Sequence, residues 1–200
     1  MEAWVAFISG VLGPVLLLVV KNLLDNNKKR KKDPLKEATE FSSDFEHILE
    51  DLRDDVDADR VWVSQFHNGG HFYPTGKSIQ KYSIFYETTH PEKMVKPVKM
   101  DFQNIPVSLF SHSINEVFTK GYMIATDLCS EDKYGLKFIA QQYDTKSIYY
   151  FALKNLEGRF VGTLGIEYTE KITKLDHDQV DLLLIKSVQL GAILDKHLKS

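Results

Sequence analysis

An apolar run near the start of the chain is the feature that most limits how it can fold. Residues 3–20 carry no charged side chain and consist mostly of Val, Leu, Ile, Phe, Ala and Gly. A helix of this length extends about 27 Å, close to the roughly 30 Å hydrocarbon core of a membrane. A buried soluble helix and a cleaved signal peptide are the alternatives. A signal peptide needs positive charge before the run, whereas only Met1 and Glu2 precede it. We therefore predict a transmembrane anchor over residues 1–24.

A basic segment follows the apolar run and predicts its orientation. Residues 28–32 read Lys-Lys-Arg-Lys-Lys, and no Lys or Arg precedes the run. Positive charge beside a membrane span marks the cytoplasmic side. We therefore expect a single-pass protein with a juxtamembrane linker over residues 25–32 and a cytoplasmic domain over residues 33–200.

The charge and cysteine content of that domain exclude several functions. The chain has a net charge of −3; residues 1–32 hold six basic and two acidic side chains (+4), which leaves −7 for residues 33–200. A domain with this negative net charge lacks the positively charged surface that binds nucleic-acid phosphates. Cys129 is the only cysteine, so the chain can form neither an intramolecular disulfide nor a four-cysteine zinc site. A reducing compartment agrees with this content.

Hydrophobic periodicity predicts an alternation of helices and strands. Asp33 suits a helix N-cap and Pro34 the first helical position, whereas Gly121 suits a helix end. Asn68-Gly69-Gly70 is expected to end the first strand. The expected elements are a helix from Asp33 into the Asp-rich residues 54–59, strands at 61–66 and 82–88, a helix at 107–120, a strand at 122–126, a helix at 133–143, strands at 147–153 and 160–168, and a helix at 176–197.

The last strand and helix carry the most specific pattern. Residues 158–168 read Gly-Arg-Phe-Val-Gly-Thr-Leu-Gly-Ile-Glu-Tyr, and an apolar-periodic helix follows over residues 175–194. This pattern and the element order resemble a GAF domain of the PAS/GAF superfamily over residues 33–200. The resemblance implies an α+β fold with an antiparallel sheet flanked by helices, and a ligand pocket between the sheet and its covering segments. Gly162 and Gly165 are expected to allow close packing on the strand.

The resemblance also allows known ligand classes to be compared with this chain. The signature of cyclic-nucleotide GAF domains is absent, and Cys129 is followed by Ser130 rather than by the His typical of bilin attachment. One cysteine is too few for members that reduce methionine sulfoxide. These comparisons leave the identity of any ligand or cofactor unknown.

A polar, glycine-containing segment after the first strand is the candidate ligand site. Residues 66–77 read Phe-His-Asn-Gly-Gly-His-Phe-Tyr-Pro-Thr-Gly-Lys, which offers groups for an anionic or polar ligand. Glu87, expected on one strand face with Ser83 and Phe85, would need a partner such as His67 or Lys77. The predicted ligand-binding residues, with Phe85 and Tyr149 as an aromatic floor, are His67, Asn68, Gly69, Gly70, His71, Lys77, Phe85, Glu87 and Tyr149.

Two other interpretations of this segment stay open. It can be a polar turn, or His67 and His71 can ligate a metal, although no third ligand has a diagnostic spacing. No nucleophile motif such as Gly-x-Ser-x-Gly is present, so we do not expect an enzyme and assign no catalytic or metal residue.

These features predict a membrane-tethered sensory or regulatory module that binds a small cytoplasmic effector and signals through its terminal helices or a partner. The alternative is a non-catalytic, membrane-bound oligomerisation or interaction module without a ligand. Two apolar helix surfaces predict a homodimer in either case. They are the heptad-like seam Ala38, Phe41, Phe45, Ile48 and Leu52, and the run Leu182 to Ile185.

The anchor can be tested by membrane extraction. We expect the full chain to stay in the membrane pellet through an alkaline carbonate wash, because an apolar span is held by the bilayer core rather than by charge. A version that begins at Asp33 should be soluble and folded. Release of the full chain by carbonate would show that residues 3–20 do not span a membrane.

Overall fold

The computed structural model describes residues 17–23, 33–71 and 76–199. The chain divides into two units, residues 1–43 and residues 44–200, and the second unit contains the whole sheet. Residues 17–23 are helical. No helix among the described residues is long and apolar enough to cross a membrane. Most of the predicted anchor and the whole predicted linker lie outside the described residues, within residues 1–16 and 24–32.

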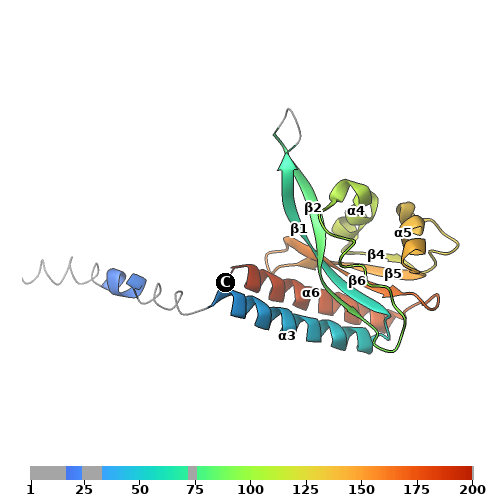
Figure 1. The fold of residues 1–200 in the computed structure, drawn as a ribbon, viewed down its shortest axis with the longest axis horizontal. Helices are drawn as coiled ribbons and strands as arrows, with labels where there is room; N and C mark the ends of the chain where they lie inside the picture. The colour runs from blue at the N-terminus through green and yellow to red at the C-terminus, as the bar shows by residue number, and fades with distance from the viewer. Residues whose placement is uncertain (1–16, 24–32, 72–75, 200) are drawn as a thin grey trace, which may run out of the picture. The chain divides into compact units, whose positions relative to one another are not determined.

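A six-stranded sheet, antiparallel throughout, forms the centre of the domain (Figure 1). Its spatial order is β3-β2-β1-β6-β5-β4, so the first and last long strands lie side by side in the middle. The strands are β1 (Arg60–His71), β2 (Ser78–Thr89), β3 (Ile105–Pro106), β4 (Tyr122–Ala125), β5 (Ser147–Lys154) and β6 (Phe160–Tyr168). The α+β class and the antiparallel sheet flanked by helices agree with the sequence-based prediction, and so does the order of the predicted elements from α3 (Pro34–Asp55) onward; the short strand β3 was not predicted.

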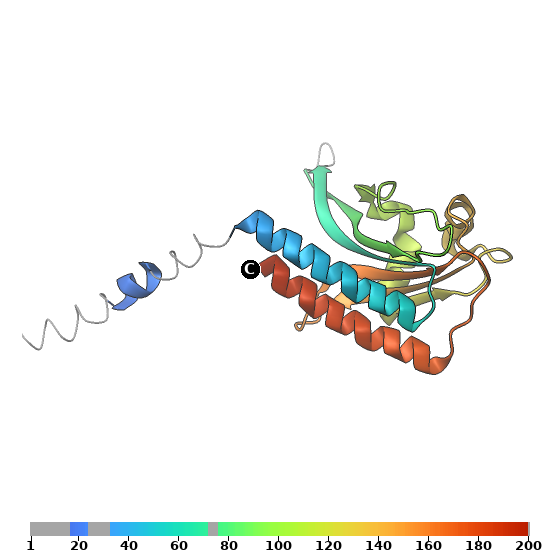
Figure 2. The same ribbon diagram turned by 60° about the horizontal axis from the view of Figure 1, so that its bottom comes forward.

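Two long helices cover one face of the sheet, as Figure 2 shows. These are α3 (Pro34–Asp55), of which the part from Asp44 onward belongs to this unit, and α6 (His177–Lys199). Phe45 is buried, with its ring centroid 4.6 Å from that of Tyr86 on β2. The Tyr168 hydroxyl donates to the Val56 carbonyl oxygen at 2.8 Å, which joins the end of β6 to the end of α3.

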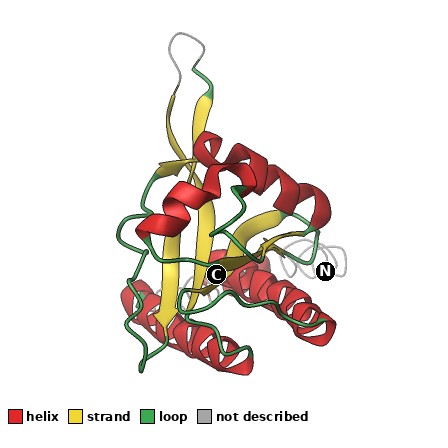
Figure 3. Ribbon diagram, turned by 90° about the vertical axis from the view of Figure 1, so that its right-hand side faces the viewer, coloured by secondary structure: helices red, strands yellow, loops and turns green. Residues whose placement is uncertain are grey.

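Shorter elements cover the opposite face, so that helices lie on both sides of the sheet (Figure 3). They are η2 (Val107–Phe110), α4 (Ser111–Lys120), η3 (Lys133–Gly135) and α5 (Leu136–Gln142), together with the loop over residues 90–104. Gly121 ends α4 as predicted: its φ is 87°, and its N–H donates to the Val117 carbonyl oxygen at 2.8 Å.

Close packing on β6 confirms the expectation for its two glycines. A Cβ at Gly165 would lie 2.2 Å from the indole ring of Trp62, and a Cβ at Gly162 would lie 2.2 Å from the Ser64 carbonyl oxygen. Trp62 stands opposite Gly165 in the β1–β6 pairing. Glycine at position 165 therefore lets the indole ring lie directly on the sheet.

One local expectation is wrong. Asn68-Gly69-Gly70 does not end β1, which continues to His71 in a hairpin with β2. Gly70 adopts a φ of 50° at a register shift, so the glycine is accommodated as an irregularity within the strand pair.

Two of the five seam residues, Phe45 and Leu52, are buried in the core of this unit and are not a free surface for a second copy. The homodimer itself stays a prediction.

Candidate functional site

A cavity lies between the sheet and the shorter elements that cover it. Its volume is about 70 Å³. The sheet contributes mostly apolar side chains, namely Trp62, Tyr82, Ile84, Met123, Ile148 and Tyr150. The covering segments contribute Val98, Phe102, Phe110, Leu136, Ala140 and Tyr143. The polar residues of the wall are Arg60, Ser113, Thr145 and Glu167.

An ion pair between Arg60 and Glu167 lies at the cavity wall. The two residues are opposite each other on β1 and β6, and Arg60 is fully buried. Glu167 also accepts from the indole N–H of Trp62 at 2.5 Å and from the Thr145 hydroxyl at 2.6 Å. Arg60 donates to the Lys96 carbonyl oxygen at 2.5 Å. A buried ion pair is tolerated when further hydrogen bonds satisfy both charges. These bonds engage the Glu167 carboxylate and both terminal nitrogens of the Arg60 guanidinium.

The ion pair was not among the residues predicted from the sequence, although a signal for it exists. Glu167 is the one charged residue of the strand over residues 160–168. A charge inside an otherwise apolar strand needs a buried partner if it points inward. The chain begins β1 with Arg60, and antiparallel pairing of the first and last long strands places it across from Glu167.

Glu87 holds the loop that forms one wall of the cavity. Its carboxylate accepts from the backbone N–H groups of Val98 at 2.7 Å and Lys99 at 2.8 Å. Burial raises the pKa of the Glu87 carboxyl, and these two hydrogen bonds only partly oppose that rise. The expectation that Glu87 pairs with His67 or Lys77 is therefore wrong.

A β-bulge explains why the predicted strand face does not exist. Val63 pairs with Tyr86 but Ser64 pairs with Ile84, so Phe85 has no partner on β1. Phe85 is 43% exposed. The extra residue reverses the alternation of side chains, so Ser83 and Glu87 do not share a face and Phe85 does not floor the cavity.

Tyr149 lies on the sheet face opposite the cavity. Its hydroxyl accepts from the Leu175 N–H at 2.7 Å and donates to the Thr173 carbonyl oxygen at 3.2 Å, which fixes the segment before α6. The next residue, Tyr150, faces the cavity instead, with its ring centroid 5.4 Å from that of Trp62. The aromatic side chains that the sheet contributes to this cavity are Trp62, Tyr82 and Tyr150, and the predicted Phe85 and Tyr149 are not among them.

The described residues of the predicted polar segment belong to paired ends of β1 and β2 that extend beyond the rest of the sheet (Figure 1). His67, Asn68, Gly69, Gly70 and His71 lie together on β1, and Lys77 lies just before β2. The His67 ring nitrogen Nε2 is 2.9 Å from the Ser83 hydroxyl oxygen. The wall of the cavity, as far as the chain is described, includes neither His67 nor Lys77. The predicted ligand-binding residues therefore do not form one site around the cavity, and the role of residues 67–71 and Lys77 in ligand binding stays a prediction.

The described part of the chain contains no group of three or more His, Cys, Asp or Glu side chains that could hold a metal ion. Cys129 is exposed.

Comparison with known proteins supplies a fold. No protein-family model and no curated protein matches the sequence. Among solved structures, the PixJ GAF domain of Thermosynechococcus elongatus in its blue-light absorbing form matches 81% of this chain and 89% of its own, with 13% identity and a TM-score of 0.61. The phycocyanobilin-bound GAF domain of a cyanobacterial phytochrome matches 90% of this chain and 94% of its own, with 14% identity and a TM-score of 0.61.

This chain has a GAF fold. A Synechocystis GAF domain in its photoproduct state agrees, at 17% identity, a TM-score of 0.58, and coverage of 79% of this chain and 96% of its own. At these identities the similarity concerns the fold alone.

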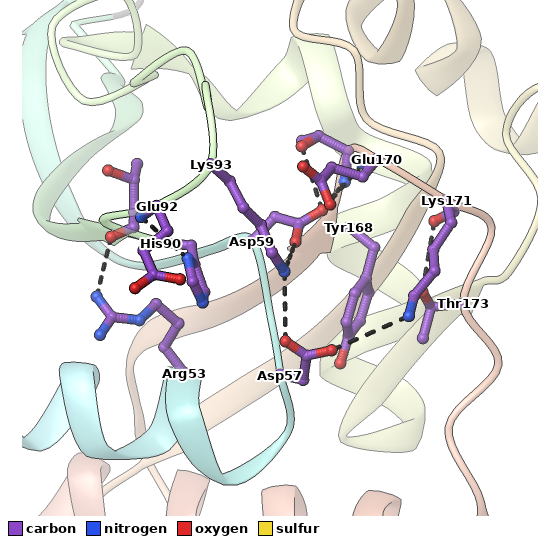
Figure 4. Close-up of polar contacts among 12 residues, drawn as sticks. Arg53, Asp57, Asp59, His90, Glu92, Lys93, Tyr168, Glu170, Lys171 and Thr173 are labelled. Atoms are coloured by element: carbon purple, nitrogen blue, oxygen red, sulfur yellow. Dashed lines mark hydrogen bonds and ion pairs between the residues drawn. The ribbon is translucent and has the colours of Figure 1, made fainter.

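A second polar cluster, centred on Asp59, lies at the start of β1 (Figure 4). Asp59 is buried and accepts from the Lys93 ammonium at 2.5 Å and from the backbone N–H groups of Thr169 at 2.6 Å and Glu170 at 3.0 Å. Burial alone would raise the pKa of Asp59, but the hydrogen bonds from Lys93 and the two amides outweigh it and hold the pKa below its usual value. Asp59 thereby joins β1, the cavity-wall loop and the connection to α6.

Replacement of Asp59 should therefore give a pH-dependent loss of stability. We expect Asp59→Asn to lower the free energy of unfolding at pH 7 by about 2–4 kcal/mol, because Lys93 loses its buried counter-charge. A carboxyl with a lowered pKa stabilises the fold above its unfolded pKa of about 3.9, and this contribution is lost as pH falls through the folded value. The difference between wild type and variant should thus shrink below about pH 4 in urea unfolding.

Asp57→Asn is the matched control. The Asp57 side chain also pairs with Lys93, at 3.3 Å, but it is 68% exposed. An exposed pair contributes about 0–1 kcal/mol, so this variant should remain near wild type. Equal losses in the two variants, or a difference that does not change with pH, would contradict the role assigned to Asp59.

Proposed function

We propose that this chain is a membrane-tethered sensory module whose GAF-fold domain binds a small effector from the cytoplasm in the cavity beside Arg60 and Glu167. The observation that carries the proposal is the cavity itself, which has a largely apolar wall and a few convergent polar groups. Small-molecule sites in proteins have this composition. The covering segments are short helices and a loop, which can move more readily than the packed helices on the opposite face.

The volume of the cavity limits the size of the effector. An engineered cavity of about 150 Å³ holds benzene, and the cavity here is about half as large. Met123 and Leu136 line the cavity with flexible side chains, so small shifts of these side chains would make room for one benzene-sized ring. A tetrapyrrole such as that of the phycocyanobilin-bound relative is far larger. The exposed Cys129, followed by Ser130, gives no further support to a bilin.

The tether and the route of signalling rest on connectivity. The apolar residues 3–20 and the basic residues 28–32 support a membrane location. Helix α3 begins at Pro34, soon after the basic residues, and its end is joined to β6 through Tyr168 and Val56. A shift of β6 on effector binding would therefore reach α3, and through α3 the juxtamembrane segment.

The four methionines of the chain provide a direct test. Met123 is buried in the cavity wall, whereas Met94 and Met100 are exposed. Molecules released by denaturing the purified protein would be identified by mass spectrometry and added back to ligand-free protein with labelled methionine methyl groups. We expect the Met123 NMR signal to shift and those of Met94 and Met100 to stay. Shifts confined to the exposed methionines would place binding outside the cavity and contradict the proposal.

An interaction module remains the second candidate, because α6 has an exposed apolar stripe. Ile185 is 58% exposed and Val188 is 59% exposed, and they lie three residues apart on one helix face. We propose that this stripe supports homodimer formation, which would bury it.

Sedimentation of paired variants tests the dimer. We expect Val188→Glu to shift the protein toward the monomer, because a charge in the centre of an apolar contact is costly to desolvate. Gln189→Glu adds the same charge at the next, also exposed position and should leave the dimer unchanged. Phe45→Glu should unfold the domain instead, because Phe45 is buried. A wild-type protein that remains monomeric at high concentration would rule out this association.

A further inference from the structure

One hydroxyl in the cavity wall lacks a hydrogen-bond partner. Ser113 on α4 is 2% exposed and lines the cavity, and its Oγ atom has no partner among the described residues. Hydroxyls within helices commonly donate to a backbone carbonyl one turn earlier. Thr119, on the same helix, does so to Asn115 at 2.7 Å, and Ser187 on α6 does so to Leu184 at 2.8 Å. Ser113 departs from this pattern at the position that meets the cavity.

A second unpaired polar atom belongs to the same wall. The Nε atom of Arg60 is buried without a partner in the described part of the chain, although both terminal nitrogens of its guanidinium are hydrogen-bonded. Buried polar groups in native proteins are rarely left unpaired, and each exception requires an explanation. A bound molecule with one polar group would explain the Ser113 hydroxyl, which belongs to the covering helix and has no charge of its own to balance.

The charges around the cavity select an uncharged molecule. The positive charge of Arg60 is already balanced by Glu167, and Glu167 is fully engaged by Arg60, Trp62 and Thr145. Glu87 lies close enough to influence the same pair electrostatically. An anion would therefore compete with Glu167 for Arg60, and a cation would compete with Arg60 for Glu167. Either would lose its hydration without gaining a free counter-charge.

We infer that the cavity binds a compact, uncharged molecule whose apolar body packs against Phe110, Met123 and Leu136 and whose single hydroxyl or carbonyl group bonds to Ser113. This inference rests on the proposed function, since it specifies the chemistry of the effector in the same cavity. Ser113 offers both a donor and an acceptor, so it can recognise either group. The polar contact distinguishes such a molecule from a hydrocarbon of equal shape.

Phenol and toluene are suitable probes because they differ only by a hydroxyl in place of a methyl group. In wild-type protein, phenol should shift the Met123 methyl signal at about fivefold lower concentration than toluene, the effect expected of one net hydrogen bond. In Ser113→Ala this preference should disappear, while toluene binds as before. Ser111→Ala, the same change at an exposed position in the first turn of α4, should keep the wild-type preference.

Thermal unfolding without any probe gives an independent readout. Removal of an unpaired buried hydroxyl relieves its desolvation cost, so Ser113→Ala should melt at the same temperature as wild type or higher. A lower melting temperature would show that a protein group or an ordered water already satisfies Ser113, and the inference would be wrong.

The remaining outcomes separate the inference from the proposed function. If phenol and toluene shift Met123 equally in the wild type, or if phenol keeps its advantage in Ser113→Ala, the cavity binds small molecules without selection by Ser113. The inference then fails and the proposed function stands. If neither probe moves Met123 in the wild type, the cavity does not admit a ring-sized molecule, and both fail.

Discussion

The buried pair of Arg60 and Glu167 is the interaction on which the cavity depends. Two charges removed from water cost free energy unless their hydrogen-bonding groups are satisfied nearby. Here the Trp62 indole N–H and the Thr145 hydroxyl donate hydrogen bonds to the Glu167 carboxylate, and the Lys96 carbonyl oxygen accepts one from Arg60. These partners come from β1, from the turn before β5 and from the loop over residues 90–104. Satisfying one ion pair thus draws three separate parts of the chain to the same wall.

The two faces of the sheet are covered in different ways. On the helical face, Phe45 and Leu49 of α3 are buried, so opening this face would expose apolar surface. On the cavity face, the loop over residues 90–104 combines apolar burial with hydrogen bonds. Val98 belongs to the hydrophobic core and Phe102 packs against it, while Glu87 accepts from the Val98 N–H and the Tyr143 hydroxyl donates to Asp101 at 3.0 Å. Individual hydrogen bonds contribute about 0.5–1.5 kcal/mol net, so the polar contacts of this loop add to the apolar burial of Val98 and Phe102 rather than replace it.

The sequence predicted the fold far better than the site, for identifiable physical reasons. Element order, the αL glycine at Gly121 and the close packing at Gly165 follow from local patterns of one or two residues. Prediction of the site required knowing which side chains of each strand face the cavity, and one extra residue in a strand reverses that alternation. The bulge at Phe85 places Glu87 on the opposite strand face from Ser83. On β5 the prediction was wrong by one residue, so it named Tyr149 instead of Tyr150. Neither the bulge nor this one-residue difference is visible in composition or periodicity.

The alternation of side chains along β1 and β6 also connects the cavity to the terminal helices. Glu167 faces the cavity, whereas the next residue, Tyr168, bonds to Val56 at the end of α3. Likewise Arg60 faces the cavity, whereas the preceding Asp59 holds Thr169 and Glu170 in the connection that leads to α6. Each member of the Arg60–Glu167 pair is therefore one residue away from a hydrogen-bonding group that attaches a long helix. The central strands of this GAF fold thus connect the cavity wall to the attachments of both helices.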